Sequence, residues 1–175
     1  MKNRGWAVWI TGPPASGKTT VAEKLKERLG DEAVSVQILE SDTLKRVLTP
    51  NPTYSAEEWE TFHTSMAYIG ALLTQNGVNV IFDATANKRR WRRAARGLID
   101  DFLQVRIRCP IEICRERDQK GVYMKAEAGE EEYAWVVQEE YEEPWHIDVE
   151  LDCVKDSPEA SAEKIMEALK ENDLI

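Results

Sequence analysis

The stretch from Gly12 to Thr20 constrains the fold more than any other part of the chain. Its residues, Gly-Pro-Pro-Ala-Ser-Gly-Lys-Thr-Thr, match the spacing G-x-x-x-x-G-K-[ST] at every fixed position. An apolar run rich in strand formers precedes it at 6–11, and apolar residues recur at helical spacing from Val21 to Leu29. A strand that enters such a turn and a helix that leaves it are the context this spacing requires. We interpret the stretch as a phosphate-binding loop, and a glycine and proline turn that matches by chance is the less favoured alternative.

In such a loop, successive backbone N–H groups point inward at the start of the helix and hold phosphate oxygens. Lys18 would bridge the β- and γ-phosphates as part of the catalytic machinery, and the Thr19 hydroxyl would bind Mg²⁺. Thr20 is a weaker second candidate. The expected nucleotide-binding residues are Gly12, Pro13, Pro14, Ala15, Ser16, Gly17, Lys18, Thr19 and Thr20.

Length and charge narrow the class of protein. A chain of 175 residues predicts one domain spanning 1–175. The net charge of -9 argues against a nucleic-acid-binding surface, which needs clustered positive charge. The one basic cluster, at 88–96, fits either an anionic small-molecule substrate or a solvated helix face, and the two remain open.

The cysteines and the chain start predict a cytoplasmic protein. Cys109, Cys114 and Cys153 have no C-x-x-C spacing and leave an odd residue over, which is typical of a reduced, intracellular chain. There is no charged and apolar leader and no apolar run near 18 residues, so we expect no membrane span. A homodimer is left open, because the sequence carries no signal for the oligomeric state.

Strand and helix patterns alternate along the chain. We expect strands at 6–11, 34–39, 78–82, 102–108 and 147–151, and helices after the loop, at 41–47, 55–75, 88–100, 111–118, through 137 and at 157–169. This order predicts an α/β fold of the phosphate-loop class, with a parallel five-stranded sheet covered by helices on both faces. Ligands bind at the carboxyl ends of such strands. Residues 119–130 break the periodicity and predict a mobile lid.

Two acids follow predicted strands at that edge of the sheet. Asp42 could accept the proton of an attacking hydroxyl and orient it towards the γ-phosphate, or it could cap the next helix, and one residue can do both. Asp83 could hold Mg²⁺, directly or through water, or it could simply form a turn.

Cations and aromatic residues supply further candidates. Phosphoryl transfer needs positive charge around the phosphates. The expected contacts are Arg117 to the nucleotide and Lys45, Asp83, Arg89 and Lys120 to the acceptor, with Arg46, Arg115 and Lys125 as weaker candidates. Trp59, Phe62, Met66 and Ile69 recur at helical spacing, which favours core packing over an aromatic wall for a ring.

With these residues in place, the chain resembles the adenylylsulfate kinase family, whose members phosphorylate the 3′-hydroxyl of adenosine 5′-phosphosulfate with ATP. The segment 110–130 is similar to the family's P-L-E-V-C-E-x-R-D-x-K-G-L-Y-K-K-A-R-A-G-E almost throughout, and 141–144 is similar to its Y-E-x-P. The resemblance implies a nucleoside-kinase-like fold with a short lid, with ATP and Mg²⁺ as cofactors.

Three segments depart from the family pattern. Residues 39–45 correspond to the family's L-D-G-D-N-V-R, and they keep its second acid but have Lys in place of its Arg. Residues 58–65 correspond to D-R-x-E-N-x-R-R and lack its arginines. Residues 84–89 correspond to F-I-S-P-Y-R and keep only its last Arg. These are largely positions that recognise the acceptor. Asp83-Ala84-Thr85 also resembles small phosphate-loop kinases that act on other metabolites or on nucleic-acid ends.

We therefore expect an ATP-dependent phosphotransferase with a hydroxyl acceptor, adenosine 5′-phosphosulfate first. One alternative is a kinase for another small hydroxyl metabolite or a nucleic-acid end. The other, from a different class, is a regulatory protein that binds ATP without transferring phosphate, and the intact Lys18, Thr19 and Asp42 count against it.

Overall fold

The sheet is parallel and has five strands in the order β2-β3-β1-β4-β5. The computed structural model describes residues 4–134 and 140–175. The strands are β1 Ala7–Thr11, β2 Val36–Glu40, β3 Asn79–Asp83, β4 Phe102–Arg108 and β5 Val149–Asp152. Every neighbouring pair is parallel, and Ile10 pairs with Asp83. The predicted α/β fold with a five-stranded parallel sheet is confirmed.

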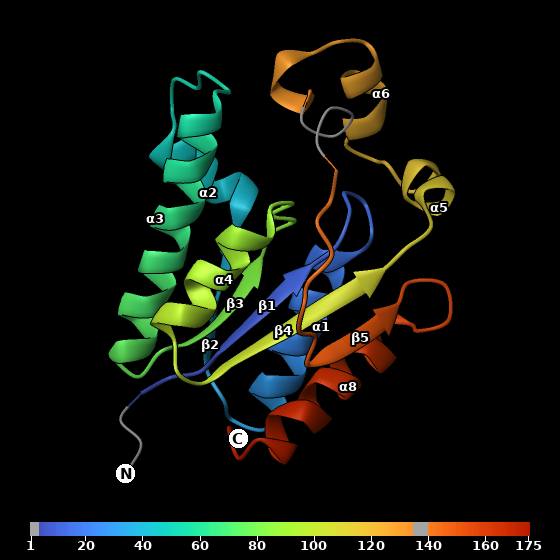
Figure 1. Cartoon of the computed structure of the whole chain (residues 1–175). Helices are drawn as coiled ribbons and strands as arrows, with labels where there is room; N and C mark the ends of the chain where they lie inside the picture. The colour runs from blue at the N-terminus through green and yellow to red at the C-terminus, as the bar shows by residue number, and fades with distance from the viewer. Residues whose placement is uncertain (1–3, 135–139) are drawn as a thin grey trace.

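Helices cover both faces of this sheet (Figure 1). The helices are α1 Lys18–Asp31, α2 Ser41–Leu48, α3 Ala56–Gln75, α4 Arg89–Leu98, α5 Ile111–Glu116, α6 Val122–Glu127 and α8 Pro158–Glu171, with a 3-10 turn at Glu131–Tyr133. Helices α3 and α8 begin at serine caps, because Ser55 Oγ accepts from the N–H of Glu58 and Ser157 Oγ accepts from that of Ala160.

Alternate residues of β1 enter two separate cores. Val8 and Ile10 pack with α1 and α8 on one face, through residues such as Leu25 and Ile165. Ala7 and Trp9 pack with α3 and α4 on the other face. The indole of Trp9 stacks on the ring of Phe82, with ring centroids 4.5 Å apart. A strand buried on both faces has no room for a charge, which explains the unbroken apolar run of β1.

The segment 119–130 contains a helix that the sequence pattern does not predict. Its broken periodicity predicts a mobile lid, and the structure has α6 within it. The reason lies in the turn before the helix, where Gly121 is left-handed and the Asp118 carboxylate accepts the N–H groups of Val122 and Tyr123. The described part of the predicted helix through 137 contains a 3-10 turn at Glu131–Tyr133, and residues 135–139 lie outside the described residues.

The expectation that all the cysteines are reduced is wrong. Cys109 and Cys153 form a disulfide, with their Cα atoms 5.3 Å apart, and Cys114 is free and buried. The two bonded residues follow β4 and β5, which are neighbours in the sheet. Their separation of 44 residues in the sequence hides this proximity. Among the described residues, no helix combines the length and apolar content needed to cross a bilayer.

Gly70 sits where α3 touches the sheet, and it offers a test of this packing. A Cβ atom at Gly70 would lie 2.1 Å from Cζ of Phe82, whereas one at Gly97 in α4 would meet nothing within 4 Å. We expect Gly70→Ala to lower the free energy of unfolding by about 1–3 kcal/mol because of overpacking. Gly97→Ala should leave it unchanged or raise it by about 0.5–1 kcal/mol. Denaturant titration measures both, and equal effects would contradict the described contact.

Candidate active site

A cleft of about 1110 Å³ opens at the carboxyl ends of the strands. It is lined by the loop before α1, the start of α2, Asp83 at the end of β3, the segment Arg117–Lys120 and the turn after β5. Figure 1 shows α6 above this edge of the sheet. The prediction that the loop, Asp42 and Asp83 lie together is confirmed, since residues of all three line the cleft.

The glycine-rich loop has the shape of an anion cradle. Gly12 has φ +155°, and a Cβ there would lie 2.8 Å from the carbonyl oxygen of Ile107. Gly17 is left-handed, with φ 98°, and α1 begins at the next residue. Ser16 Oγ is enclosed and has no hydrogen-bond partner among the described residues. A left-handed turn into a helix N-terminus with a spare enclosed hydroxyl fits a phosphate group.

Lys18 is folded back onto this loop. Its Nζ donates to the carbonyl oxygens of Gly12 at 3.1 Å and Pro13 at 2.8 Å. Burial lowers the pKa of Lys18, and the nearby charge of Asp83 opposes this shift. The ammonium group is therefore held inside the loop, where bound phosphate oxygens would lie.

Thr19 and Asp83 contact one another directly. The Thr19 hydroxyl donates to Oδ2 of Asp83 at 2.6 Å, and Asp83 is only 3% exposed. Burial raises the pKa of Asp83, while Lys18 and the hydroxyl of Thr19 act in the opposite direction. A hydroxyl and a carboxylate are hard oxygen donors of the kind that Mg²⁺ prefers. The pair therefore fits a magnesium ion, and no group of three or more His, Cys, Asp or Glu side chains in the described parts of the chain forms another metal site.

Asp42 lies in the first turn of α2 and forms an ion pair with the lid. Its Oδ2 accepts from Nζ of Lys120 at 2.7 Å. Burial by itself would raise the pKa of Asp42, but the hydrogen bond and charge of Lys120, with Lys45 and Lys18, outweigh it and lower the pKa. Asp42 is therefore ionised near neutral pH and accepts hydrogen bonds.

The lid also contacts the phosphate loop itself. The hydroxyl of Tyr123, in α6, donates to the carbonyl oxygen of Pro14 at 3.0 Å. Arg117 lines the cleft and donates through Nη2 to the carbonyl oxygen of Cys153. Sequence reasoning missed Tyr123, because a single tyrosine in a polar segment gives no signal of its partner.

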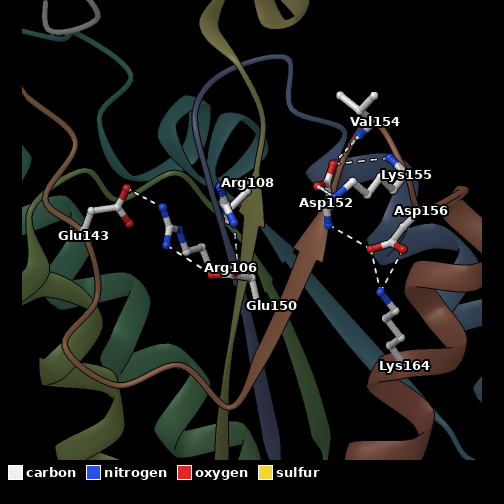
Figure 2. Close-up of polar contacts among 9 residues, drawn as sticks. All are labelled: Arg106, Arg108, Glu143, Glu150, Asp152, Val154, Lys155, Asp156 and Lys164. Atoms are coloured by element: carbon white, nitrogen blue, oxygen red, sulfur yellow. Dashed lines mark hydrogen bonds and ion pairs between the residues drawn. The ribbon is translucent and has the colours of Figure 1, made fainter.

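The turn after β5 forms another wall of the cleft. Asp152 Oδ1 accepts the N–H groups of Val154 and Lys155, and Asp156 accepts the N–H of Asp152 and pairs with Lys164 of α8 (Figure 2). These bonds hold the turn against α8. Figure 2 also shows Arg106 of β4 between two glutamates, Glu143 and Glu150, which ties the segment before β5 to the sheet.

The part of the cleft formed by α2, α3 and α4 is rich in aromatic rings. Lys45, Trp59, His63 and Trp91 all line it. The ammonium group of Lys45 lies 4.3 Å from the centroid of the Trp59 ring. Of the four residues predicted at helical spacing, Phe62 and Met66 are buried, and Trp59 and Ile69 pack against the same core. The favoured interpretation as core packing is therefore confirmed, and Trp59 in addition lines the cleft.

Most of the basic cluster at 88–96 does not reach the cleft. Arg89, predicted to contact the acceptor, donates from its backbone N–H to Glu142 Oε2 and from Nε to the Glu143 carbonyl, and it is absent from the cleft lining. Arg92 is fully buried and donates to the Ala86 and Glu142 carbonyls. Other members pair with Glu60 and Asp148. Arg89, Arg90, Arg92 and Arg96 therefore bind the protein's own acids and carbonyls. Outside the cluster, Arg115 pairs with Glu127, and Lys125 lies over the ring of Tyr133.

Comparison with known proteins agrees with this geometry. The profile of the adenylylsulphate kinase family matches residues 4–152. The adenylyl-sulfate kinase of Halothermothrix orenii is 35% identical over 100% of this chain and 95% of its own length. The probable adenylyl-sulfate kinase of Pyrococcus abyssi is 36% identical over 95% of this chain and 96% of its own. The structure of the Mycobacterium tuberculosis APS kinase CysC in complex with AMPPNP and APS has a TM-score of 0.86 at 27% identity, covering 95% of this chain and 98% of that one.

The pair of Asp42 and Lys120 makes a prediction about titration. In Lys120→Met, Asp42 loses a hydrogen bond and a nearby positive charge, so its pKa should rise. A ¹³C NMR titration of the Asp42 carboxyl measures this shift. The matched control is Lys155→Met, which removes a lysine paired with Asp152 instead and should leave the Asp42 pKa unchanged. An unaltered pKa in Lys120→Met would mean that the pair does not form in solution.

Proposed function

Since this chain belongs to the adenylylsulfate kinase family, we propose that it transfers the γ-phosphoryl group of ATP to a hydroxyl group, with adenosine 5′-phosphosulfate as the first acceptor. The observation that carries the proposal is the meeting of Lys18, the Thr19–Asp83 pair and Asp42 in one cleft at the ends of β1, β2 and β3. Transfer requires that the groups that bind the nucleotide phosphates and the group that orients the acceptor hydroxyl lie in the same cleft.

On this proposal the loop amides and Lys18 bind the phosphates, and Thr19 and Asp83 would hold Mg²⁺. An ion held there would supply positive charge beside the phosphates. Asp42 orients the acceptor hydroxyl. As the new bond from oxygen to phosphorus forms and the bond to the leaving ADP breaks, the hydroxyl proton passes to the Asp42 carboxylate.

The lid would supply charge and exclude water. Lys120 pairs with Asp42 in the structure, and Arg117 contacts the turn after β5, so both side chains border the cleft from the lid side. When an acceptor hydroxyl occupies the Asp42 carboxylate, Lys120 is free to turn to phosphate oxygens. Fixed cations of this kind stabilise the charge of phosphoryl transfer.

A second acceptor class is supported by one observation. Trp59 stands where the family pattern D-R-x-E-N-x-R-R has its first arginine, and it carries an indole ring into the cleft. An indole does not bind phosphosulfate as a guanidinium does, and Lys45 in place of Arg cannot form the same planar fork. A different small hydroxyl metabolite is therefore the alternative acceptor.

Release of ADP from Mg-ATP tests the acceptor. We expect adenosine 5′-phosphosulfate to stimulate ADP release strongly over ATP alone, measured with a coupled assay. Stimulation only by other hydroxyl metabolites would replace this acceptor with the alternative class. ATP binding without transfer to any acceptor would support the regulatory protein instead. The intact set of Lys18, Thr19 and Asp42 makes that last result the least expected.

Asp42 can be tested separately from nucleotide binding. We expect Asp42→Ala to lower kcat by about 10²- to 10⁴-fold, because a general base is lost. The Kd for ATP should stay within about threefold of the wild type, since the phosphate loop is untouched. Asp31→Ala is the matched control, because Asp31 is an exposed aspartate at the far end of α1. A wild-type rate in Asp42→Ala would rule out the assigned role.

A further inference from the structure

His63 is a buried histidine that the phosphate chemistry does not use. It lies on α3, is 4% exposed and lines the part of the cleft formed by α2, α3 and α4. Its imidazole stacks on the indole of Trp91, with centroids 3.8 Å apart and planes 4° apart, and Phe62 meets it edge-on. Two aromatic neighbours therefore fix the plane of the ring.

The hydrogen bond of His63 sets which nitrogen carries the proton. Nδ1 lies 2.9 Å from the carbonyl oxygen of Trp59, one turn earlier in the helix. A carbonyl oxygen can only accept, so Nδ1 carries the hydrogen. Burial lowers the pKa of His63 to about 3, so the ring is neutral near pH 7. In a neutral ring with the hydrogen on Nδ1, Nε2 holds a lone pair and accepts.

Nothing in the described parts of the chain occupies that lone pair. No hydrogen bond to Nε2 is found among residues 4–134 and 140–175. The polar side-chain atoms there that are both enclosed and unpaired are Ser16 Oγ, Arg92 Nε and Arg96 Nε. Nε2 is not one of them, and His63 lines the cleft. A buried acceptor that faces a cleft and lacks a protein partner is suited to a ligand.

We propose that His63 is a specificity-determining residue, whose Nε2 accepts a hydrogen bond from an N–H or O–H group on the ring of the phosphoryl acceptor. This rests on the proposed function, since it assumes that the acceptor occupies this side of the cleft. The ligand chemistry is a ring that carries a hydrogen-bond donor, with an anionic group for the neighbouring Lys45. The donor is an amino group in a purine acceptor and a hydroxyl in a sugar acceptor.

Neighbouring residues fit the same ligand. Trp59 lines the cleft beside His63, with the two ring centroids 5.9 Å apart. Lys45 lies over the Trp59 ring, 4.3 Å from its centroid, which places a positive charge next to this ring. A neutral hydrogen-bond acceptor beside a cation can bind a ligand that carries both a hydrogen-bond donor and an anionic group. A site of this kind rejects analogues that lack the donor.

The experiment measures binding, so it does not depend on turnover. Calorimetry gives the Kd of adenosine 5′-phosphosulfate in the presence of Mg²⁺ and a non-hydrolysable ATP analogue. His63→Phe keeps an aromatic ring against Trp91 but removes the acceptor nitrogen, and it should weaken binding of adenosine 5′-phosphosulfate by about three- to tenfold. His63→Gln, which can place an amide oxygen near the position of Nε2, should recover part of the loss. The Kd of the ATP analogue should not change in either variant.

An analogue and a control variant sharpen the result. The purine riboside counterpart of adenosine 5′-phosphosulfate has a hydrogen in place of the amino group and no N–H on its base, so the wild type should bind it more weakly and His63→Phe should discriminate less between the two. Tyr68→Phe removes a hydroxyl from the exposed side of the same helix and should bind like the wild type. If the acceptor screen identifies a sugar instead, its deoxy analogues take the place of the purine riboside compound.

Unchanged affinity for the acceptor in His63→Phe would overturn this inference while leaving the phosphotransferase intact. Loss of affinity for the ATP analogue as well would overturn it too, because it would show a merely structural role for His63. If the wild-type protein binds adenosine 5′-phosphosulfate but releases no ADP, and the His63 variants bind it more weakly, the proposed function is contradicted and the assignment of His63 stands.

Discussion

The parallel pairing of β1 with β3 is the constraint on which the site depends. In this register Ile10 lies opposite Asp83, so the phosphate loop leaves the sheet beside an aspartate that is 64 residues from Thr19 in the sequence. Both faces of β1 are buried, and slipping the register by one residue would turn every apolar side chain to the opposite face. The packing of α1 and α8 on one face of the sheet and of α3 and α4 on the other therefore fixes the register that brings Thr19 to Asp83.

Charge in the cleft is balanced within the protein. Lys18 donates to loop carbonyls, and Lys120 pairs with Asp42. A phosphate oxygen could take the place of the loop carbonyls at Lys18. An acceptor hydroxyl could take the place of Lys120 at Asp42. The loop carbonyls keep the enclosed charge of Lys18 from being left without a partner, which would be costly at a site of low dielectric constant.

The two sides of the cleft use different chemistry. Residues of the loop before α1, with their hydroxyls and Lys18, line one part, whereas indole and imidazole rings line the part formed by α2, α3 and α4, together with Lys45. The arginines of 88–96, which looked available from the sequence, do not line the cleft. Arg92 joins the loop at Ala86 to the segment at Glu142, and its neighbour Trp91 stacks on His63. These arginines therefore connect the segments around the aromatic part of the cleft without reaching it.

The sequence by itself determined the phosphate loop, the order of strands and helices, the edge of the sheet where the site lies, and the family. These follow from local patterns, because apolar periodicity, caps and motif spacing act within a few residues of one another. Only the tertiary structure decided that Cys109 and Cys153 are bonded, that Arg89 and its neighbours bind the protein's own carbonyls and acids, that Tyr123 holds the loop, and that His63 faces the cleft. Each of these depends on a contact between segments far apart in the chain, whose partners the local pattern of either segment does not specify.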